Sequence, residues 1–204
     1  MSKRAKCSQC NKALVACFCH TITKQNNELN VVILQHPSEV KHARGTAKIL
    51  ELSLSHCQIL VGEDFSDDQQ FKQLFTASDK KLLLLYPGDE TISPQVLSQE
   101  IAQTDQQLND YVVIVIDGSW KKAYKIFCLN PVLAELTRIG IDVDNQSNYR
   151  IRKSSRSDSL STLEACYTLL SQVEQKDYSS LLTSFDYMVN FQLNSMPEQV
   201  KRRY

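Results

Sequence analysis

Apolar runs and helical repeats alternate along the chain. Short runs rich in valine, isoleucine and leucine predict strands, and the stretches between them carry apolar residues every three or four positions, which predicts helices. The predicted strands cover residues 31–36, 57–61, 81–86 and 111–116, and the predicted helices cover 39–54, 67–75, 94–103 and a segment that starts at 120. Because the strand runs are apolar throughout instead of alternating with polar residues, we expect an α/β fold with a mostly parallel sheet covered by helices on both faces.

The pattern is less regular after residue 130. Short strands are expected around 138–143 and 149–152, followed by a polar, basic loop. A further helix then starts at Ser161 or Thr162, either of which has the hydroxyl group that caps a helix. The basic loop is interpreted either as a wall of a ligand pocket or as an ordinary surface connection.

The strand at 111–116 ends on Asp117, Gly118 and Ser119, and Trp120 opens the next helix. Ligands of open α/β sheets bind beyond the carboxyl ends of the strands, so Asp117 occupies the position of a catalytic or ligand-binding carboxylate. The alternative is that Asp117 only caps the following helix. The apolar face predicted for that helix consists of Trp120, Ala123, Tyr124 and Phe127. On periodicity alone, Trp120 is then a core residue.

Four of the seven cysteines lie in one short tract, at Cys7, Cys10, Cys17 and Cys19. A Cys-x-x-Cys pair followed by a Cys-x-Cys pair can place four thiolates around a tetrahedral zinc ion, and a full thiolate set indicates a structural site. The alternatives are unmetallated thiols in an unfolded tail, or a redox pair, whose usual βαβ setting is missing. We therefore expect a zinc-binding segment over 1–25 and a main domain over 26–204. The remaining cysteines, expected to be small core residues, are Cys57, Cys128 and Cys166.

Basic and acidic residues number 23 each, so the average charge of the chain does not favour nucleic acid. Basic residues nevertheless cluster within 3–6, 150–156 and 201–203, where they would either contact RNA phosphates or form solvated surface. No apolar segment has the length of a membrane span or the form of a signal peptide, so no membrane partner is expected. Together with cysteines that need no disulfide, this favours a cytoplasmic protein.

Four separated groups of residues together match the pattern of a known protein family. The first two are Arg4-x-x-Cys7-x-x-Cys10 with Cys17-x-Cys19, and Gln35-His36-Pro37-x-Glu39 followed by Thr46 and Leu50. The others are Tyr86-Pro87-Gly88, and Asp117-Gly118-Ser119-Trp120 with the later Tyr149-Arg150-Ile151-Arg152-Lys153 and Leu160-Ser161-Thr162-Leu163-Glu164-Ala165. In this order and spacing they span nearly the whole chain and resemble the DTW-domain family of SPOUT-like aminocarboxypropyltransferases that act on RNA. Ser119 departs from the threonine usual in the family but keeps the hydroxyl group.

The resemblance implies a SPOUT-like catalytic domain and leaves open whether its chain is knotted. It implies transfer of the 3-amino-3-carboxypropyl group of S-adenosylmethionine to N3 of a uridine in tRNA, leaving methylthioadenosine. It also implies Asp117 as the general base, with Ser119 and Trp120 beside it in the catalytic group. The residues implied to bind S-adenosylmethionine are Tyr86, Pro87, Gly88, Ile116, Gly118, Arg152, Leu160, Ser161 and Thr162. The residues expected to contact tRNA are His36, Arg44, Lys121, Lys122, Arg150, Lys153 and Arg156.

Two other functions stay open on the sequence. A methyltransferase would use the same donor on the same type of fold, and only the mass of the product distinguishes it. A non-enzymatic zinc-tailed module would hold RNA without modifying it, although the carboxylate of Asp117 would repel phosphate. The sequence also leaves open the number of subunits.

Overall fold

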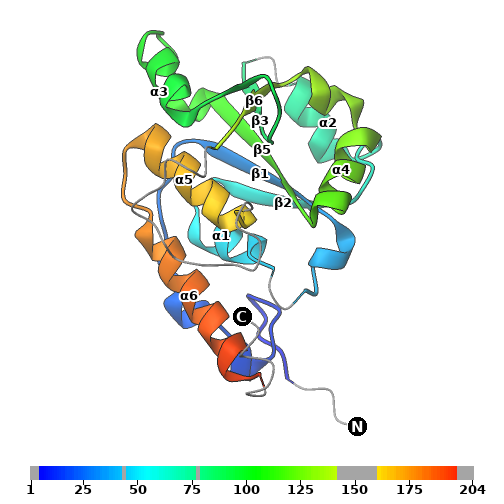
Figure 1. Cartoon of the computed structure of the whole chain (residues 1–204), viewed down its shortest axis with the longest axis vertical. Helices are drawn as coiled ribbons and strands as arrows, with labels where there is room; N and C mark the ends of the chain where they lie inside the picture. The colour runs from blue at the N-terminus through cyan, green and yellow to red at the C-terminus, as the bar shows by residue number, and fades with distance from the viewer. Residues whose placement is uncertain (1–4, 43–44, 77–78, 142–159, 197–204) are drawn as a thin grey trace.

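The structure is a computed structural model, and it describes residues 5–42, 45–76, 79–141 and 160–196. Figure 1 shows a central sheet between helices, with the N-terminal segment packed at one end of the molecule beside α6. Within the described residues the sheet has six strands, all parallel, in the order β2-β1-β5-β3-β6-β4. The predicted α/β class and parallel sheet are therefore confirmed.

The four strands predicted before residue 120 are all present, each to within about one residue at either end. The strands are β1 Asn30–Gln35, β2 Cys57–Val61, β3 Lys81–Leu85, β4 Thr91–Ile92, β5 Tyr111–Asp117 and β6 Thr137–Ile139. The helices are α1 Ala47–Ser53, α2 Gln69–Thr76, α3 Pro94–Ala102, α4 Trp120–Leu129, α5 Thr162–Glu174 and α6 Ser179–Asn194. Short 3-10 turns lie at Leu14–Ala16, Cys19–Thr21, Pro37–Glu39, Leu108–Asp110 and Pro131–Glu135.

The sheet carries an apolar core on each face, which explains why its strands are apolar throughout. Val31 and Ile33 of β1 belong to the core that contains the buried residues of α1, α3, α5 and α6. Val32 and Leu34 point to the other face and pack in the core formed with α2 and α4. Because successive side chains of a strand alternate between faces, a strand buried on both sides needs apolar residues at every position.

The helix predicted over 39–54 is wrong in its first half. Helix α1 begins at Ala47, and the preceding segment forms successive turns in which backbone N–H groups donate three residues back. Glu39 donates to the carbonyl of His36 at 2.9 Å, His42 donates to that of Glu39, and Gly45 donates to that of His42. The imidazole of His36 also accepts the N–H of Ser38 at 3.2 Å, so local side-chain bonding replaces the first helical turn.

The apolar face predicted for α4 is right for Ala123 and Phe127 but wrong for Trp120 and Tyr124. The residues of α4 that are buried against the sheet are Ala123 and Ile126. Trp120 and Tyr124 lie on the solvent side, with 52% and 62% of their surface exposed. Cys128, predicted to be a core residue, is exposed on the same helix.

The N-terminal segment packs on α6, a helix that the sequence pattern did not reveal. Phe18 is fully buried in the core that also contains α6, and Ser184 of α6 donates to the carbonyl of Thr21 at 2.9 Å. The rings of His20 and Tyr187 meet edge to face, with their centroids 4.6 Å apart. The strand predicted at 149–152 lies outside the described residues. Among the described helices, none has both the length and the apolar character needed to cross a membrane.

Candidate functional site

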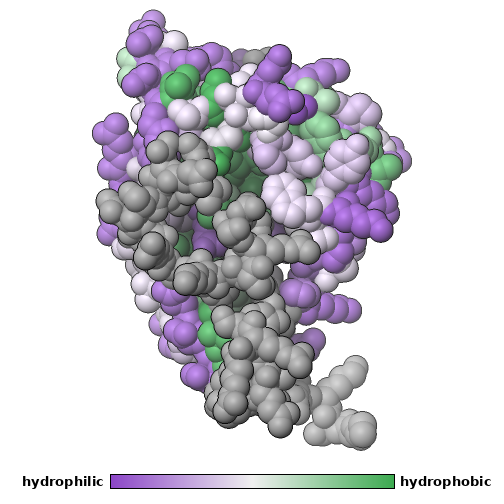
Figure 2. Space-filling model, viewed as in Figure 1, coloured by the Kyte–Doolittle hydropathy of each residue, from purple (hydrophilic) through white to green (hydrophobic). Residues whose placement is uncertain are grey.

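A cavity of about 930 Å³ opens at the carboxyl edge of the sheet. Its walls come from the segments that follow β3, β5 and β6, from β4, and from the start of α5. Because β5, β3 and β6 are neighbouring parallel strands, their carboxyl ends bring these separate segments together. Figure 2 shows a hollow on this face with apolar surface at its floor. The volume lies within the usual range of small-molecule sites.

Most of the described residues that the sequence assigns to a site line this cavity. They are Tyr86, Pro87, Gly88, Ile116, Gly118, Ser119, Trp120, Lys121, Leu160 and Thr162. Asp117 and Ser161 are not part of the lining, but each is flanked in the chain by two residues that are. Five assigned residues lie outside the described residues, namely Arg44, Arg150, Arg152, Lys153 and Arg156.

Asp117 is buried beneath the cavity wall, with 7% of its surface exposed. The side-chain amide of Gln35, at the end of the neighbouring strand β1, donates to Oδ2 of Asp117 at 2.8 Å. The hydroxyl of Thr162, at the start of α5, donates to Oδ1 at 2.6 Å. Thr162 also lines the cavity. Through its hydrogen bond, it links the buried carboxylate of Asp117 to the cavity wall.

Ser161 caps α5 instead of facing the cavity. Its hydroxyl accepts the N–H of Glu164 at 3.2 Å, and the Glu164 carboxylate accepts the N–H of Ser161 at 2.8 Å. This reciprocal arrangement is a capping box, and it confirms the predicted helix start. The Glu164 carboxylate also places a negative charge at the amino end of α5, where a ligand anion would otherwise be favoured.

Two glycines in the cavity wall allow close packing of neighbouring side chains. A Cβ atom at Gly140 would lie 2.5 Å from Oγ1 of Thr91, and one at Gly88 would lie 2.8 Å from Nη1 of Arg138. The Arg138 guanidinium lies 5.1 Å from the ring centre of Phe127, and this ring stacks on Tyr86 with an interplanar angle of 4°. This stack fixes the ring of Tyr86 at the edge of the cavity.

The sequence did not identify several residues of the cavity wall. They include Thr91, Ser93, Val115, Ile139, Gly140, Ile141 and Ala165. No sequence motif marks these residues, and only their location in the sheet relates them to the cavity. Ile139 to Ile141 lie at or just beyond the end of β6, and Thr91 belongs to the short strand β4 beside it. Recognising them requires the strand order, since the end of β6 is next to the cavity only because β6 pairs with β3.

Two residues assigned to tRNA contacts are held by intramolecular ion pairs near the cavity. Nε2 of His36 lies 2.6 Å from a carboxylate oxygen of Glu63, and Nζ of Lys122 lies 2.7 Å from Glu39. Lys125 also pairs with Glu63, and this hydrogen bond, together with that of His36, lowers the pKa of Glu63. An RNA phosphate would therefore compete with carboxylates for these side chains.

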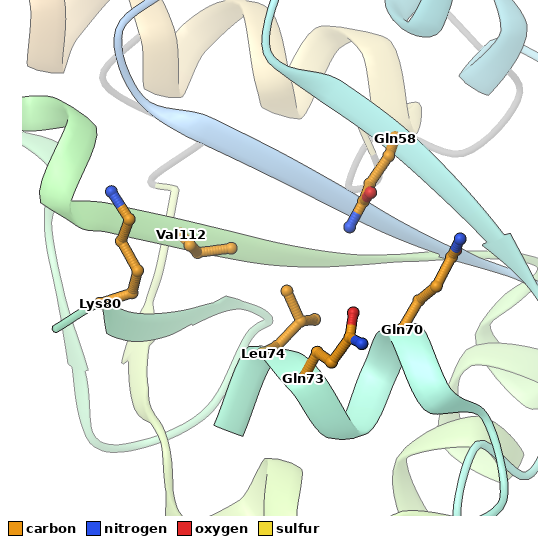
Figure 3. A pocket seen from close by; sticks show the side chains of 6 residues that line it. All are labelled: Gln58, Gln70, Gln73, Leu74, Lys80 and Val112. Atoms are coloured by element: carbon orange, nitrogen blue, oxygen red, sulfur yellow. The ribbon is translucent and has the colours of Figure 1, made fainter. Parts of the chain in front are cut away.

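A second cavity, of about 230 Å³, opens at the opposite edge of the sheet. Figure 3 shows its lining, which consists of Gln58, Gln70, Gln73, Leu74, Lys80 and Val112. Nζ of Lys80 donates to the carbonyl of Asn109 at 2.6 Å. Among the described residues that line this cavity, none has a carboxylate or hydroxyl for proton transfer, so the carboxyl edge is the better candidate for a reaction.

The four cysteines of the N-terminal tract form a compact cluster in which all sulfur atoms lie within 4.8 Å of one another. Cys7 and Cys19 have their Sγ atoms 3.7 Å apart, and so do Cys10 and Cys17. A zinc ion with four thiolates at about 2.3 Å requires sulfur–sulfur separations of about 3.8 Å. Asn11, with a φ of 59°, lies in the turn that follows Cys10, and its N–H donates to the carbonyl of Cys7. The geometry fits a tetrahedral zinc site.

The surroundings of these thiols shift their pKa values in different directions. The backbone N–H groups of Cys10 and Gln9 lower the pKa of Cys7 to about 6. Burial, together with hydrogen bonds from the other cysteines, raises the pKa of Cys19 well above its usual value. A divalent cation bound by the cluster would supply the positive charge that stabilises thiolate ligands.

A family model described as the DTW domain matches residues 4–193 of the chain. Three similar curated proteins carry the name tRNA-uridine aminocarboxypropyltransferase 2. The one from Drosophila melanogaster is 29% identical over 180 residues, which are 86% of this chain and 69% of that protein. Those from Macaca fascicularis and Mus musculus are each 27% identical over 197 residues, 94% of this chain and 64% of theirs. The chain thus spans about two thirds of the length of these relatives. No solved structure matches the chain significantly.

Proposed function

The chain belongs to the DTW domain family, and from this premise we propose that it transfers the 3-amino-3-carboxypropyl group of S-adenosylmethionine to N3 of a uridine in tRNA. The observation that carries the proposal is the family match over residues 4–193, together with similar proteins named as tRNA-uridine aminocarboxypropyltransferases. The cavity at the carboxyl edge supports it. Ten of the residues assigned to the site from the sequence line that cavity.

The cavity supports a nucleoside-sized donor in three ways. Its volume of about 930 Å³ accommodates a drug-sized ligand. Its floor is apolar where Leu85, Val115 and Ile139 line it, which suits the adenine ring. Gly88 and Gly118 belong to its walls, so a base could hydrogen-bond to main-chain groups there.

The proposed reaction exchanges one covalent bond for another. The N3 atom of uracil attacks the γ-carbon of the methionine moiety, and the bond from that carbon to sulfur breaks. Sulfur takes the electron pair, so the donor leaves as neutral methylthioadenosine, and the N3 proton passes to a base. Because the sulfonium is already an activated leaving group, most of the acceleration comes from alignment of N3 with the γ-carbon.

Asp117 and Thr162 are proposed to accept the N3 proton as a pair. The Thr162 hydroxyl donates to Asp117 at 2.6 Å, which leaves the lone pairs of its oxygen for an N–H group in the cavity. A proton leaving N3 would pass to the Thr162 oxygen while the Thr162 proton moves to the carboxylate. Gln35 keeps the second carboxylate oxygen in place from the other side. Asp117 then acts as a base without entering the cavity.

The N-terminal cluster is proposed to bind one structural zinc ion through Cys7, Cys10, Cys17 and Cys19. Four thiolate ligands complete the tetrahedral coordination of zinc and leave no position for a substrate. Zinc would hold this segment against α6 through contacts such as that of His20 with Tyr187. Reduced thiols of this kind, and a tRNA substrate, fit the cytoplasm.

The described basic residue best placed for RNA is Lys121, because it lies in the cavity wall. The proposed substrate would present its phosphates to this charge while the uridine enters the cavity. His36 and Lys122 lie near the same edge but are paired with carboxylates, so they would contribute only after exchange of those partners.

Mass analysis of nucleosides tests the proposal. The full chain is incubated with unmodified tRNA and S-adenosylmethionine, and the tRNA is digested to nucleosides. The expected product is uridine with the added mass of an aminocarboxypropyl group, together with released methylthioadenosine. A methyl adduct would identify a methyltransferase instead, and RNA binding without any adduct would identify a non-enzymatic module.

Two variants make the test specific to the site. Asp117→Asn keeps a side chain that can bond to Gln35 and Thr162 but has no basic carboxylate, so it should lose modification and keep tRNA affinity. Glu135→Gln changes an exposed carboxylate outside the cavity lining and should behave as the unchanged protein. Full modification by Asp117→Asn would remove Asp117 from the mechanism.

A further inference from the structure

Helix α4 presents two large aromatic side chains to solvent. Trp120 is 52% exposed and Tyr124 is 62% exposed, whereas Ala123 and Ile126 on the other side of the helix are buried. Residues four apart on a helix are neighbours on its surface, with their Cβ atoms about 5–6 Å apart. Trp120 and Tyr124 therefore form an aromatic pair on one exposed stripe. Large aromatic rings are usually buried, so an exposed aromatic pair indicates a surface that binds another molecule.

The aromatic pair lies at the edge of the cavity. Trp120 and the adjacent Lys121 belong to its lining. Tyr124 follows one turn further along α4, just outside this lining. The pair thus continues the cavity wall outward onto the surface of α4.

The chemistry of the reaction identifies what would reach this surface. N3 of uracil lies on the Watson–Crick edge, so a uridine can present it to a cavity only when it is unpaired and out of the base stack. The nucleotides beside such a uridine are then also open to stacking on aromatic side chains, which is how proteins commonly bind single-stranded RNA. Lys121 adds positive charge for the backbone that joins these nucleotides.

We propose that Trp120 and Tyr124 form a stacking surface for an unpaired nucleobase adjacent to the uridine that enters the cavity, an inference that rests on the proposed function. Trp120 holds the end of this surface at the cavity, and Tyr124 extends it away from the cavity along α4. A phenol ring is neutral near pH 7, so the ring of Tyr124 does not repel phosphate. Tyr124 accordingly contributes to RNA binding and not to the transfer step.

The chain offers a direct optical probe, because Trp120 is its single tryptophan. The full, zinc-loaded chain is titrated with a short single-stranded RNA that contains the target uridine, and tryptophan fluorescence is recorded without S-adenosylmethionine. Quenching should saturate with RNA concentration. The same RNA with an abasic nucleotide on each side of the uridine should bind roughly tenfold more weakly, because the stacking partner is missing.

Variants of Tyr124 separate stacking from other roles. Tyr124→Ala should raise the KM for tRNA about tenfold and leave kcat unchanged, whereas Tyr124→Phe keeps the ring and should restore KM. Leu129→Ala removes another exposed apolar side chain of α4, more than two turns away from Trp120, and should leave both constants unchanged. Circular dichroism of each variant checks that the fold is retained.

The outcomes distinguish this inference from the function on which it rests. If the transfer reaction fails but quenching occurs and depends on Tyr124, the stacking surface stands and the proposed reaction is wrong. If the transfer reaction proceeds and Tyr124→Ala keeps the normal KM, the stacking surface is wrong. A fluorescence change that follows protein concentration without RNA would assign the pair to self-association and overturn the proposal.

Discussion

Replacement of Thr162 by valine breaks the connection between the cavity and the buried carboxylate of Asp117. The Thr162 hydroxyl donates to Oδ1 of Asp117 at 2.6 Å, and Gln35 donates to Oδ2 at 2.8 Å. Valine has nearly the same shape but no donor, so Thr162→Val removes the first bond and leaves the second. A hydrogen bond to a charged group contributes about 1.5–3 kcal/mol, and Thr162 is only partly buried. We therefore expect the free energy of unfolding to fall by about 2 kcal/mol, measured by urea denaturation.

The effect on catalysis should exceed the effect on stability. General base catalysis typically contributes about 100-fold or more to the rate, so kcat for aminocarboxypropyl transfer should fall by at least about 100-fold in Thr162→Val. Thr162→Ser retains the hydroxyl and is the matched control, expected to keep most of the rate. Single-turnover measurement with saturating tRNA and S-adenosylmethionine separates this step from binding.

A double variant tests whether the two residues act as one unit. If Thr162 works only by passing the proton to Asp117, adding Thr162→Val to Asp117→Asn should cost little further rate. The reasoning is refuted if Thr162→Val loses stability as expected but transfers the group at the normal rate. The hydrogen bond would then be structural, and the base would have to be sought elsewhere.

Three further predictions concern metal, packing and thiol chemistry. Metal analysis should find about one zinc ion per chain, and its removal by a chelator should lower the melting temperature, because the four thiols of the cluster need its charge. Gly140→Ala should destabilise the fold by about 1–3 kcal/mol in urea denaturation, because the new Cβ would lie 2.5 Å from Oγ1 of Thr91; an unchanged midpoint would contradict this close packing. At about pH 8, just below the usual pKa of a free thiol, iodoacetamide should modify exposed Cys128 before Cys57, as mass spectrometry of the native protein can show. Burial, and then the charge of Glu51, raises the pKa of Cys57 to about 12, so its thiol stays protonated and unreactive below that pH, and equal rates would contradict the packing.

The layer order of the fold could be predicted because it depends on local patterns. Continuous apolar runs predicted β1, β2, β3 and β5, and both faces of the sheet are indeed covered. The start of α1 could not be predicted, because the N–H of Ser38 bonds to the His36 side chain where the first helical turn was expected, and further turns follow as far as His42. Periodicity also assigned Trp120 to the core. On α4 several stripes contain apolar residues, and only the packing of Ala123 and Ile126 against the sheet decides which stripe is buried.

The amino-acid sequence by itself determined the α/β class, the four-cysteine tract, and Asp117 at a strand end, because each is written in adjacent or regularly spaced residues. The tertiary structure decided which partners those residues meet. It brought Gln35 and Thr162 to the two oxygens of Asp117, and placed the ends of β6 and β4 in the cavity wall. These contacts join residues far apart in the chain, and they exist only because the strand order and the packing of α5 set their positions in space.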